Sequence, residues 1–299
     1  MKVASVVVTF NPDLVLLEKQ LVSISGFTSV ILVDNASINI ERIEETCAKI
    51  SNSIALIKFD KNNGLGLAQN TGIKEAEKLG CSHVILFDQD SYFSRDSYEK
   101  LVEREKLLIS LGLNVGAIGP ACIDPATGSA YPVTEYRGPF IVRKYLNDSE
   151  VCQASFIVAS GSLIRLEVIQ SVGMMMDKLF IDYIDVEWCY RAQSLGYKLF
   201  ATRESILEHN IGDARVKFFG RSISMHSATR RYYLTRNCFL MLSLPHIPIG
   251  YKFREIGLLL ARISAFMYLS KERARYIKLM FRAISDAWHG KYGKLEENI

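Results

Sequence analysis

The chain has 299 residues, of which 49% are hydrophobic and 23% charged, so it is long enough for one large α/β domain with an appendage or for two small domains. The high apolar content excludes an intrinsically disordered protein. The net charge of +4 conceals a basic C-terminal third, and the six cysteines form no Cys-x-x-Cys pair, which favours reduced thiols in a cytoplasmic protein over disulfides or a zinc site.

The first 120 residues contain short apolar runs that are rich in β-branched residues. Each run is too short for a helix and too apolar for a half-exposed strand, so buried parallel strands are predicted. Amphipathic helical patterns fill the intervals between them. The expected strands are residues 3–8, 30–33, 54–59, 84–87 and 115–120, and the expected helices are residues 13–24, 67–79 and 97–111. Strands that alternate with helices predict a parallel, doubly wound sheet.

The pattern loosens in the middle of the chain. Residues 121–150 are rich in Gly, Pro, Thr, Asn and Asp, and are expected to form a long loop, either with or without a hairpin. Further strands are expected at residues 154–159, 197–202 and 206–208. From about Ser222 onward the chain is predicted to be helical and basic.

Residues 215–299 hold 16 Lys and Arg against 5 Asp and Glu, a net charge of +11, whereas residues 1–214 carry −7. This basic segment predicts an anionic partner, and phosphorylated lipid, a membrane surface and nucleic acid all fit. Its longest apolar stretch, residues 256–269, is interrupted by Arg262 and is shorter than the roughly 20 residues of a membrane-spanning helix. Any membrane contact is therefore expected to be peripheral.

Two carboxylates follow the fourth predicted strand, in Phe87-Asp88-Gln89-Asp90. Ligands bind at the carboxyl ends of strands in open α/β sheets, and residues two apart on an extended chain point to the same side. Asp88 and Asp90 are therefore candidates to hold one divalent cation, Mg²⁺ or Mn²⁺, that also touches a diphosphate. The alternative is a pair of solvated acids at the start of a loop.

Three acids, Asp182, Asp185 and Glu187, lie within six residues and precede Trp188. The helical spacing of Ile184 and Trp188 places the first two acids in or near a first helical turn. Ordinary helix capping is one interpretation, since the helix dipole favours acids there. The other is a general base that removes a proton from an acceptor hydroxyl, although the dipole is expected to lower its pKa.

Other polar residues also follow predicted strands. Thr9-Phe10-Asn11 and Asp34-Asn35 lie at strand ends, where they either contact a ligand or form ordinary turns. The Gly-rich segment 62–70 opens a helix, but it lacks the third glycine of a dinucleotide fingerprint and follows the third strand, so no NAD site is expected. It either lets the backbone approach a nucleotide or is a plain helix-entry turn.

Two basic features lie further along the chain. His209 ends the last predicted strand, where a lone histidine is more often structural than a ligand. Three arginines accompany two tyrosines in residues 230–237, and arginine suits bidentate phosphate binding. Arg231 and Arg236 are therefore candidates for diphosphate binding, and a solvated basic helix face is the alternative.

Taken in chain order, these motifs resemble glycosyltransferase family 2, and within it the bacterial rhamnosyltransferases of O-antigen and cell-wall polysaccharide assembly. The resemblance covers roughly residues 3–240. The motifs lie at residues 7–12, 33–37, 63–72, 86–91 and 180–191. Five motifs in family order are far more specific than any one of them.

This resemblance implies an α/β, Rossmann-like nucleotide-binding glycosyltransferase type A fold, with a mixed central sheet and a C-terminal helical extension. Residues 1–240 would form the catalytic domain, divided into a nucleotide-sugar-binding half at 1–120 and an acceptor half at 121–240. Residues 241–299 would form a basic amphipathic helical extension, which is assigned by composition only.

The resemblance also implies roles for individual residues. Asp185 matches the general base of an inverting, in-line displacement, and His209 matches a third metal ligand beside Asp88 and Asp90. The residues expected to contact the donor are Thr9, Phe10, Asn11, Asp34, Asn35, Asn63, Gly64, Gln69, Asp88, Gln89 and Asp90. The residues expected to contact the acceptor are Asp182, Glu187 and Trp188.

The resulting hypothesis is transfer of L-rhamnose from dTDP-L-rhamnose to a lipid-linked saccharide at the cytoplasmic face of the cell membrane. The basic, aromatic-rich C-terminal helices would lie against anionic lipid as a peripheral contact, or would form a homodimer interface. Rival donors are UDP-galactofuranose or a UDP-hexose, and a rival of a different class is an inactive scaffold that binds nucleotide sugars. Nucleic acid is not expected, because no nucleic-acid-binding motif is present.

Overall fold

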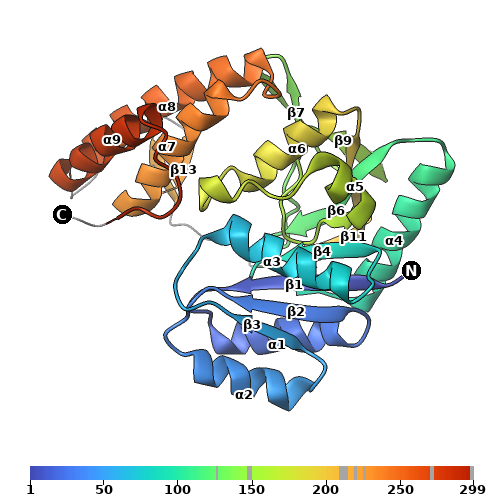
Figure 1. The fold of residues 1–299 in the computed structure, drawn as a ribbon. Coiled ribbons are helices and arrows are strands. Elements are labelled where there is room, and N and C mark those ends of the chain that lie inside the picture. Colours follow the sequence, from blue (N-terminus) through green and yellow to red (C-terminus); the bar gives the residue numbers. More distant parts are fainter. Residues whose placement is uncertain are drawn as a thin grey trace.

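The structure, a computed structural model, describes residues 1–125, 127–146, 150–208, 215–218, 221–224, 227–269 and 273–296. Four parallel strands form the N-terminal half of its central sheet (Figure 1). They are β1 (Val3–Thr9), β2 (Ser29–Asp34), β3 (Ala55–Lys58) and β4 (His83–Phe87), in the spatial order β3-β2-β1-β4. β1 is buried along its whole length, as its apolar sequence predicts. The first four expected strands are thereby confirmed.

The sheet continues with strands of both directions. β10 (Leu163–Arg165) runs antiparallel between β4 and β6 (Val115–Ile123), and β11 (Lys198–Glu208) runs parallel to β6. β5 (Tyr92–Phe93) and β9 (Val151–Ala154) both pair antiparallel with β11. The sheet is therefore mixed, as the family resemblance implies, and the parallel arrangement predicted from the alternation of strands and helices is confirmed for β1 to β4.

The middle of the chain differs from its expected strands. A hairpin of β7 (Val133–Arg137) and β8 (Phe140–Lys144) occupies the segment expected to be a long loop. The strand expected at residues 154–159 ends at Ala154, because the next residue, Ser155, donates its N–H to Thr134 of the hairpin instead (3.0 Å). The two strands expected at residues 197–202 and 206–208 are the single strand β11, which is interrupted by an irregularity in its pairing.

Helices cover both faces of the sheet (Figure 1). One face carries α1 (Leu14–Ser25), α2 (Ile40–Ile50) and α4 (Arg95–Ser110), and the other carries α3 (Leu65–Lys78), α5 (Leu166–Val172) and α6 (Ile184–Ser194). The expected helices are α1, α3 and α4. α2 was not predicted, although Ile40, Ile43, Cys47 and Ile50 lie at helical spacing in it.

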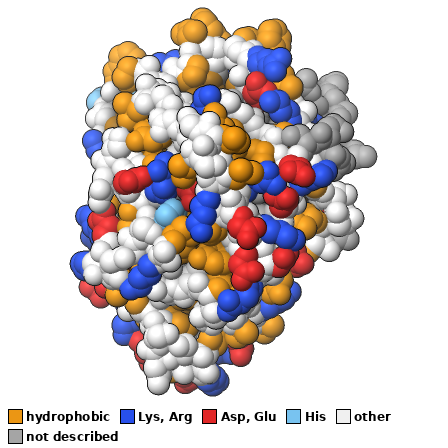
Figure 2. All heavy atoms as spheres, turned by 90° about the vertical axis from the view of Figure 1, so that its right-hand side faces the viewer, with side chains coloured by type: hydrophobic (Ala, Val, Ile, Leu, Met, Phe, Trp, Pro, Cys, Tyr) orange, Lys and Arg blue, Asp and Glu red, His pale blue; other side chains and the backbone are white. Residues whose placement is uncertain are grey.

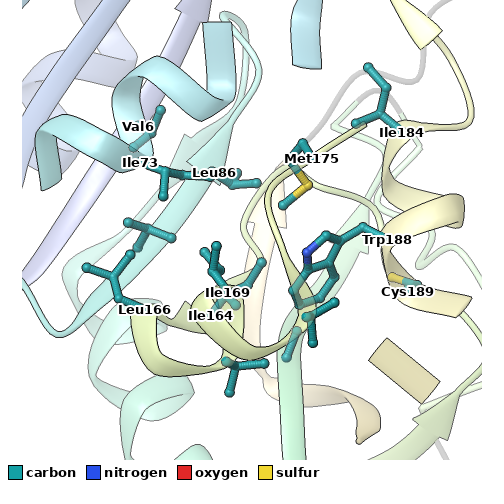
Figure 3. Close-up of a cluster of buried hydrophobic side chains, with 14 of the residues drawn as sticks. Val6, Ile73, Leu86, Ile164, Leu166, Ile169, Met175, Ile184, Trp188 and Cys189 are labelled. Atoms are coloured by element: carbon teal, nitrogen blue, oxygen red, sulfur yellow. The ribbon is translucent and has the colours of Figure 1, made fainter. Parts of the chain in front are cut away.

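The core on the α3 side of the sheet joins the two halves of the chain (Figure 3). Trp188 of α6 is 2% exposed and donates its Nε1 hydrogen to the carbonyl oxygen of Gly173 (2.9 Å). α3 lies close to β1, because a Cβ added at Gly72 would be 2.3 Å from Val6 Cγ1. This close approach sets where the N-terminus of α3 meets the end of β1.

Three helices end the chain, α7 (Ala228–Ser243), α8 (Ile249–Leu269) and α9 (Arg273–Trp288), and they lie together at one end of the molecule (Figure 1). The helical segment expected from about Ser222 starts later, because β13 (Arg221–Ser224) pairs with β12 (Arg215–Phe218). α7 packs against α9, so the domain boundary predicted at residue 240 falls inside the first helix of this group. Among the described residues, no helix has the length and apolarity needed to cross a bilayer.

The face that carries α4 shows side chains of both charges in alternation (Figure 2). Lys100 pairs with Asp96 at 2.7 Å, and Arg104 pairs with Glu150 at 3.0 Å. This face therefore gathers no large area of one charge that would indicate an anionic or cationic partner, as far as the coloured residues of the figure show.

Candidate active site

Loops at the carboxyl ends of β1, β2 and β4 form one side of a cleft of about 570 Å³, and the start of α6 forms the other. This is the edge at which open α/β sheets bind ligands. The predicted site residues that line the cleft are Phe10, Asn35, Gly64, Gln69, Asp88, Gln89, Asp90, Asp182 and Asp185. The structure thus brings together most of the expected donor residues and the expected base.

Thr9 and Asp34 lie beneath the cleft and are 0% and 1% exposed. The Asp34 carboxylate accepts hydrogen bonds from Thr9 Oγ1 (2.8 Å), Ser37 Oγ (2.5 Å) and the Ser37 N–H (2.8 Å). Buried carboxylates require such donors. These two residues therefore shape the turns after β1 and β2, and the structure does not bring them to the cleft surface, where a nucleoside contact is expected.

The turn after β1 is held from two directions. Asn11 has a φ of 49°, which asparagine tolerates better than most residues. Its Oδ1 accepts a hydrogen bond from the Ile38 N–H (2.9 Å), so it lies beside the cleft and does not line it. The Phe10 N–H donates to Gln89 Oε1 (2.8 Å). Gln89 thereby ties the end of β4 to the end of β1.

Amide contacts join the Gly-rich segment to Asn35. Asn35 Nδ2 donates to Asn62 Oδ1 (3.0 Å), and Asn35 Oδ1 accepts from the Asn63 N–H (2.8 Å). Gly64 has a φ of 89°, and a Cβ there would lie 2.7 Å from the Phe180 carbonyl oxygen, so only glycine permits this approach. Asn62 was not among the predicted residues, although its place directly before Asn63 and Gly64 was a signal for it.

The backbone after β4 is fixed by buried residues of other elements. Gln20 Nε2 of α1 donates to the Asp88 carbonyl oxygen (2.6 Å), and the Asp88 N–H donates to Ser160 Oγ (3.2 Å). Ser160 Oγ also shares a hydrogen bond with Ser91 Oγ (2.7 Å). Asp88 and Asp90 are both half-buried, so their carboxylates start from a rigid backbone at the edge of the cleft.

Asp88 and Asp90 suit Mg²⁺ or Mn²⁺, because Mg²⁺-type sites use one or two carboxylates together with substrate phosphates and water. Within the described part of the chain, no group of three or more His, Cys, Asp and Glu is arranged to hold a metal ion. His209, the predicted third ligand, lies outside the described residues. The two carboxylates therefore fit a metal that completes its coordination from a bound diphosphate.

Asp185 lies in the first turn of α6 and lines the cleft. Burial raises its pKa from 3.8 to about 6, the Val186 N–H opposes this through a hydrogen bond of 2.9 Å, and the negative charges of Asp88 and Asp182 raise it further. The lower pKa expected from the helix dipole is wrong, because the loss of solvation outweighs it. A carboxyl group with this pKa is ionised at neutral pH and is a stronger base than an ordinary aspartate.

Asp182 lines the cleft from a strained turn in which Phe180, Asp182 and Tyr183 have φ values of 67°, 64° and 64°. Its carboxylate pairs with Arg230 of α7 at 3.0 Å. Arg230 lines the cleft but was not selected from the sequence. Two adjacent arginines, Arg230 and Arg231, indicate a phosphate site in the sequence. Which of them reaches the cleft depends on how α7 is rotated about its axis, and the structure shows that it is Arg230.

Two residues that were predicted to contact the acceptor do not line this cleft. Glu187 is 0% exposed and forms an ion pair with Arg191 at 2.9 Å, and His246 Nε2 lies 2.9 Å from the same carboxylate. Trp188 is packed in the core between α6 and the sheet. Both are buried because they lie on the inner side of α6, so neither side chain reaches the cleft.

The two arginines predicted to bind diphosphate are also buried elsewhere. Arg231 places its guanidinium 4.0 Å from the centre of the Phe266 ring. Arg236 is 1% exposed and donates to the carbonyl oxygens of Gly293 (2.7 Å) and Leu179 (3.2 Å). The structure therefore does not bring Arg231 or Arg236 to the cleft.

A second cleft of about 1220 Å³ adjoins the first and shares Asn62 and Phe180 with it. Asn63, an expected donor residue, lines this second cleft. Gly290 and residues 292–296 line it as well, and the Gly293 N–H donates to the Lys178 carbonyl oxygen (3.0 Å). The C-terminal segment thus returns to the neighbourhood of the site.

Residues 6–173 match the family model described as glycosyl transferase family 2. Among curated proteins, the chain is similar to the dTDP-rhamnosyl transferase RfbF of Shigella flexneri. The two are 31% identical over 295 residues, which cover 97% of this chain and 96% of that one. The similarity therefore extends through the C-terminal helices.

Three solved structures share the fold at low sequence identity. GalNAc-T7 with UDP, GalNAc and Mn²⁺ aligns with a TM-score of 0.59 and 17% identity over 91% of this chain, which spans 58% of that protein's chain. The mannosyltransferase PcManGT of Pyrobaculum calidifontis, with GDP-Man and Mn²⁺, aligns with a TM-score of 0.56 and 15% identity, covering 98% of this chain and 76% of that one. S. aureus TarS with UDP-GlcNAc gives a TM-score of 0.54 and 15% identity, with 96% and 81% covered.

Proposed function

Because the chain belongs to glycosyltransferase family 2 and is a glycosyltransferase of the type A fold, we propose that its cleft transfers L-rhamnose from dTDP-L-rhamnose to a saccharide hydroxyl group. The observation that carries the proposal is one cleft that holds both the carboxylate pair after β4 and the half-buried carboxyl group of Asp185, whose pKa is raised. The donor is proposed from the name of the S. flexneri relative.

Asp185 is the proposed general base. The acceptor oxygen attacks the anomeric carbon from the side opposite the diphosphate, Asp185 takes the hydroxyl proton as the new bond forms, and the bond to the diphosphate oxygen breaks. This single displacement inverts the anomeric configuration. A pKa near 6 leaves Asp185 ionised at neutral pH and basic enough to assist the attack.

The donor would lie along the ends of β1, β2 and β4. Asp88 and Asp90 would hold Mg²⁺ or Mn²⁺, which when bound neutralises charge on the departing diphosphate. Asn35 and the Gly64 backbone would receive the nucleoside, since both line the cleft. The diphosphate role predicted for Arg231 and Arg236 would fall to Arg230, which lines the cleft and also pairs with Asp182 there (3.0 Å).

A thermal-shift panel of dTDP, UDP, GDP and CMP, each with and without Mn²⁺, tests the donor. We expect dTDP with Mn²⁺ to raise the Tm most. A ligand at about 100 times its Kd stabilises the folded state by roughly 2.7 kcal/mol, which corresponds to a shift of about 4 °C for a chain of this size. Absence of a shift with all four nucleotides would contradict the proposed function.

The same panel separates the rival functions. A Mn²⁺-dependent shift with UDP alone would replace the proposed donor by UDP-galactofuranose or a UDP-hexose, with the same base and the same cleft. An inactive scaffold would give a nucleotide shift without release of dTDP from dTDP-L-rhamnose in the presence of an acceptor. Nucleotide release measured beside the shift therefore distinguishes an enzyme from a binding protein.

The outer side of α8 supports a peripheral membrane contact at the inner face of the cell membrane. Four apolar residues at helical spacing, Ile249, Phe253, Ile256 and Leu260, are 68%, 67%, 41% and 62% exposed. α9 adds the exposed residues Phe281 and Trp288. A basic segment with such an apolar stripe is suited to anionic lipid, where a lipid-linked acceptor would be met.

Replacing Phe253 and Leu260 by glutamate in the full chain is expected to lower its sedimentation with anionic liposomes several-fold, because both side chains would leave the lipid and add negative charge. Val15→Glu is the matched control, since Val15 is 75% exposed on α1. Unchanged binding of the double variant would exclude α8 as the contact. A change from dimer to monomer in size-exclusion chromatography would instead identify this stripe as a homodimer interface.

A further inference from the structure

Residues 179–183, which lead into α6, are held by side chains from the C-terminal helices. We propose that Asn237, Arg230 and Glu255 are positioning residues. They fix this segment and thereby direct Asp185 into the cleft. The role of Asp185 rests on the function proposed above, whereas the contacts that hold the segment do not depend on it.

The backbone of this segment is strained. Phe180, Asp182 and Tyr183 all have positive φ values, between 64° and 67°. Residues other than glycine rarely adopt this region, because Cβ comes too close to a carbonyl oxygen, and such conformations persist only where the surroundings impose them. Tyr183 is also the N-cap of α6, and its carbonyl accepts from the Glu187 N–H (2.8 Å). Its conformation therefore sets the direction of the turn that carries Asp185.

Asn237 supplies two of the restraints. Its side chain is fully buried, and its Nδ2 donates to the carbonyl oxygens of Leu179 (2.9 Å) and Ile181 (2.8 Å). Its Oδ1 accepts from Nε and Nη2 of Arg236, at 3.1 Å each. Because a guanidinium can only donate, it dictates which end of the amide faces the segment. Arg236 therefore serves to orient Asn237.

Two further contacts reach the strained residues themselves. Arg230 of α7 pairs with the Asp182 carboxylate at 3.0 Å. The Tyr183 hydroxyl donates to Glu255 Oε2 of α8 at 2.7 Å. Glu255 is 3% exposed and lies 3.6 Å from Arg262, which keeps its charge compensated. α7 and α8 thus hold consecutive residues of the segment in place.

These contacts make the C-terminal helices part of the catalytic site, whatever surface their outer side meets. A chain cut near Pro245 would lose Glu255 and Arg262 as well as any lipid contact. A loss of turnover after such a cut would therefore not report on the membrane. Variants of the full chain separate the positioning of residues 179–183 from the lipid contact.

Asn237→Ala in the full chain is expected to lower kcat about 10- to 100-fold, since small misplacements of a catalytic group have effects of this size. The KM for dTDP-L-rhamnose and the dTDP-induced shift are expected to change less than about threefold, because Asn237 Nδ2 donates to Leu179 and Ile181 and not to a residue proposed to hold the donor. A kcat within twofold of the parent would overturn the proposal.

Ser243→Ala is the matched control. It removes a hydrogen bond of α7, from Ser243 Oγ to the Leu240 carbonyl oxygen at 2.8 Å, that involves neither the segment nor Arg236. For this control we expect a lower Tm but a kcat within about twofold of the parent. An equal loss of kcat in both variants would show that Asn237→Ala acts through general destabilisation and would contradict the positioning role. If Asn237→Ala fails to fold, Tyr183→Phe deletes only the hydroxyl that meets Glu255 and is expected to lower kcat with the same unchanged donor affinity.

Combining Asn237→Ala with Asp185→Asn separates this inference from the proposed function. If Asn237 acts through Asp185, the second change leaves the residual turnover of Asp185→Asn unaltered. Additive losses in the combined variant would overturn the route through Asp185. Full turnover of Asp185→Asn alone would show that the proposed base is wrong, while a loss of kcat in Asn237→Ala would still support the positioning of the segment.

Discussion

Asp185→Asn is expected to lower turnover about 10²- to 10⁴-fold while leaving dTDP binding intact. A general base contributes a rate factor of this size, and asparagine keeps the shape of the side chain but cannot take the proton. In the parent, kcat/KM is expected to rise with pH through about 6 and then level off, because only the ionised carboxylate is active. Release of dTDP, measured between about pH 5 and pH 8, reports both effects.

The control for this variant is Asp13→Asn. Asp13 caps α1 by accepting from the Val15 N–H (2.9 Å), and asparagine caps equally well, so turnover is expected to stay unchanged. Burial raises the pKa of Asp185 in the folded state, so its ionised form costs stability above about pH 6, and this cost vanishes below about pH 4. The Tm of Asp185→Asn at neutral pH should therefore match or exceed that of the parent. Undiminished turnover would move the base to another residue.

Asp90→Asn is expected to remove most of the Mn²⁺-dependent part of dTDP binding and to reduce turnover more than about 100-fold. A bound metal stabilises developing charge by several kcal/mol, and about 3 kcal/mol already exceeds a factor of 100 in rate. Asparagine retains one oxygen ligand but loses the negative charge that Mg²⁺ and Mn²⁺ prefer. Calorimetric titration of dTDP with and without Mn²⁺ measures the effect on binding.

Asp96→Asn provides the comparison, since Asp96 lies six residues further along the chain and pairs on the surface with Lys100 of α4. Its dTDP affinity and turnover should equal those of the parent. If the parent itself binds dTDP equally well with and without Mn²⁺, the proposed metal role of Asp88 and Asp90 is contradicted. The pair would then serve only to position the donor sugar.

The donor side of the site could be predicted because it follows from the buried strands. An apolar run that ends in a polar residue fixes where the strand leaves the core, and parallel strands end at the same edge. Asp88, Asp90 and Asn35 reach one cleft for this reason. Asp185 was found by its place in a motif, but its raised pKa depends on burial that no local pattern gives.

The acceptor side was less predictable because it depends on helix phase and on distant partners. Glu187 lies only two residues from Asp185, yet it is buried against His246, which is 59 positions away in the sequence. Arg236 belongs to a sequence typical of phosphate binding, but its guanidinium donates hydrogen bonds to the carbonyl oxygens of Leu179 and Gly293 instead. β10 has three residues, too few for any periodicity to show.

The contacts of Asn237 affect how the chain folds while it is being synthesised. Its hydrogen bonds to Leu179 and Ile181 span 58 and 56 positions, whereas every strand of the central sheet lies before residue 209. A nascent chain can therefore complete its sheet, and with it the donor side, before the segment that carries the base is secured. If Asn237 has the role proposed above, an incomplete chain at the ribosome would hold nucleotide sugar without transferring it, and activity would begin only when α7 and α8 have folded against residues 179–183.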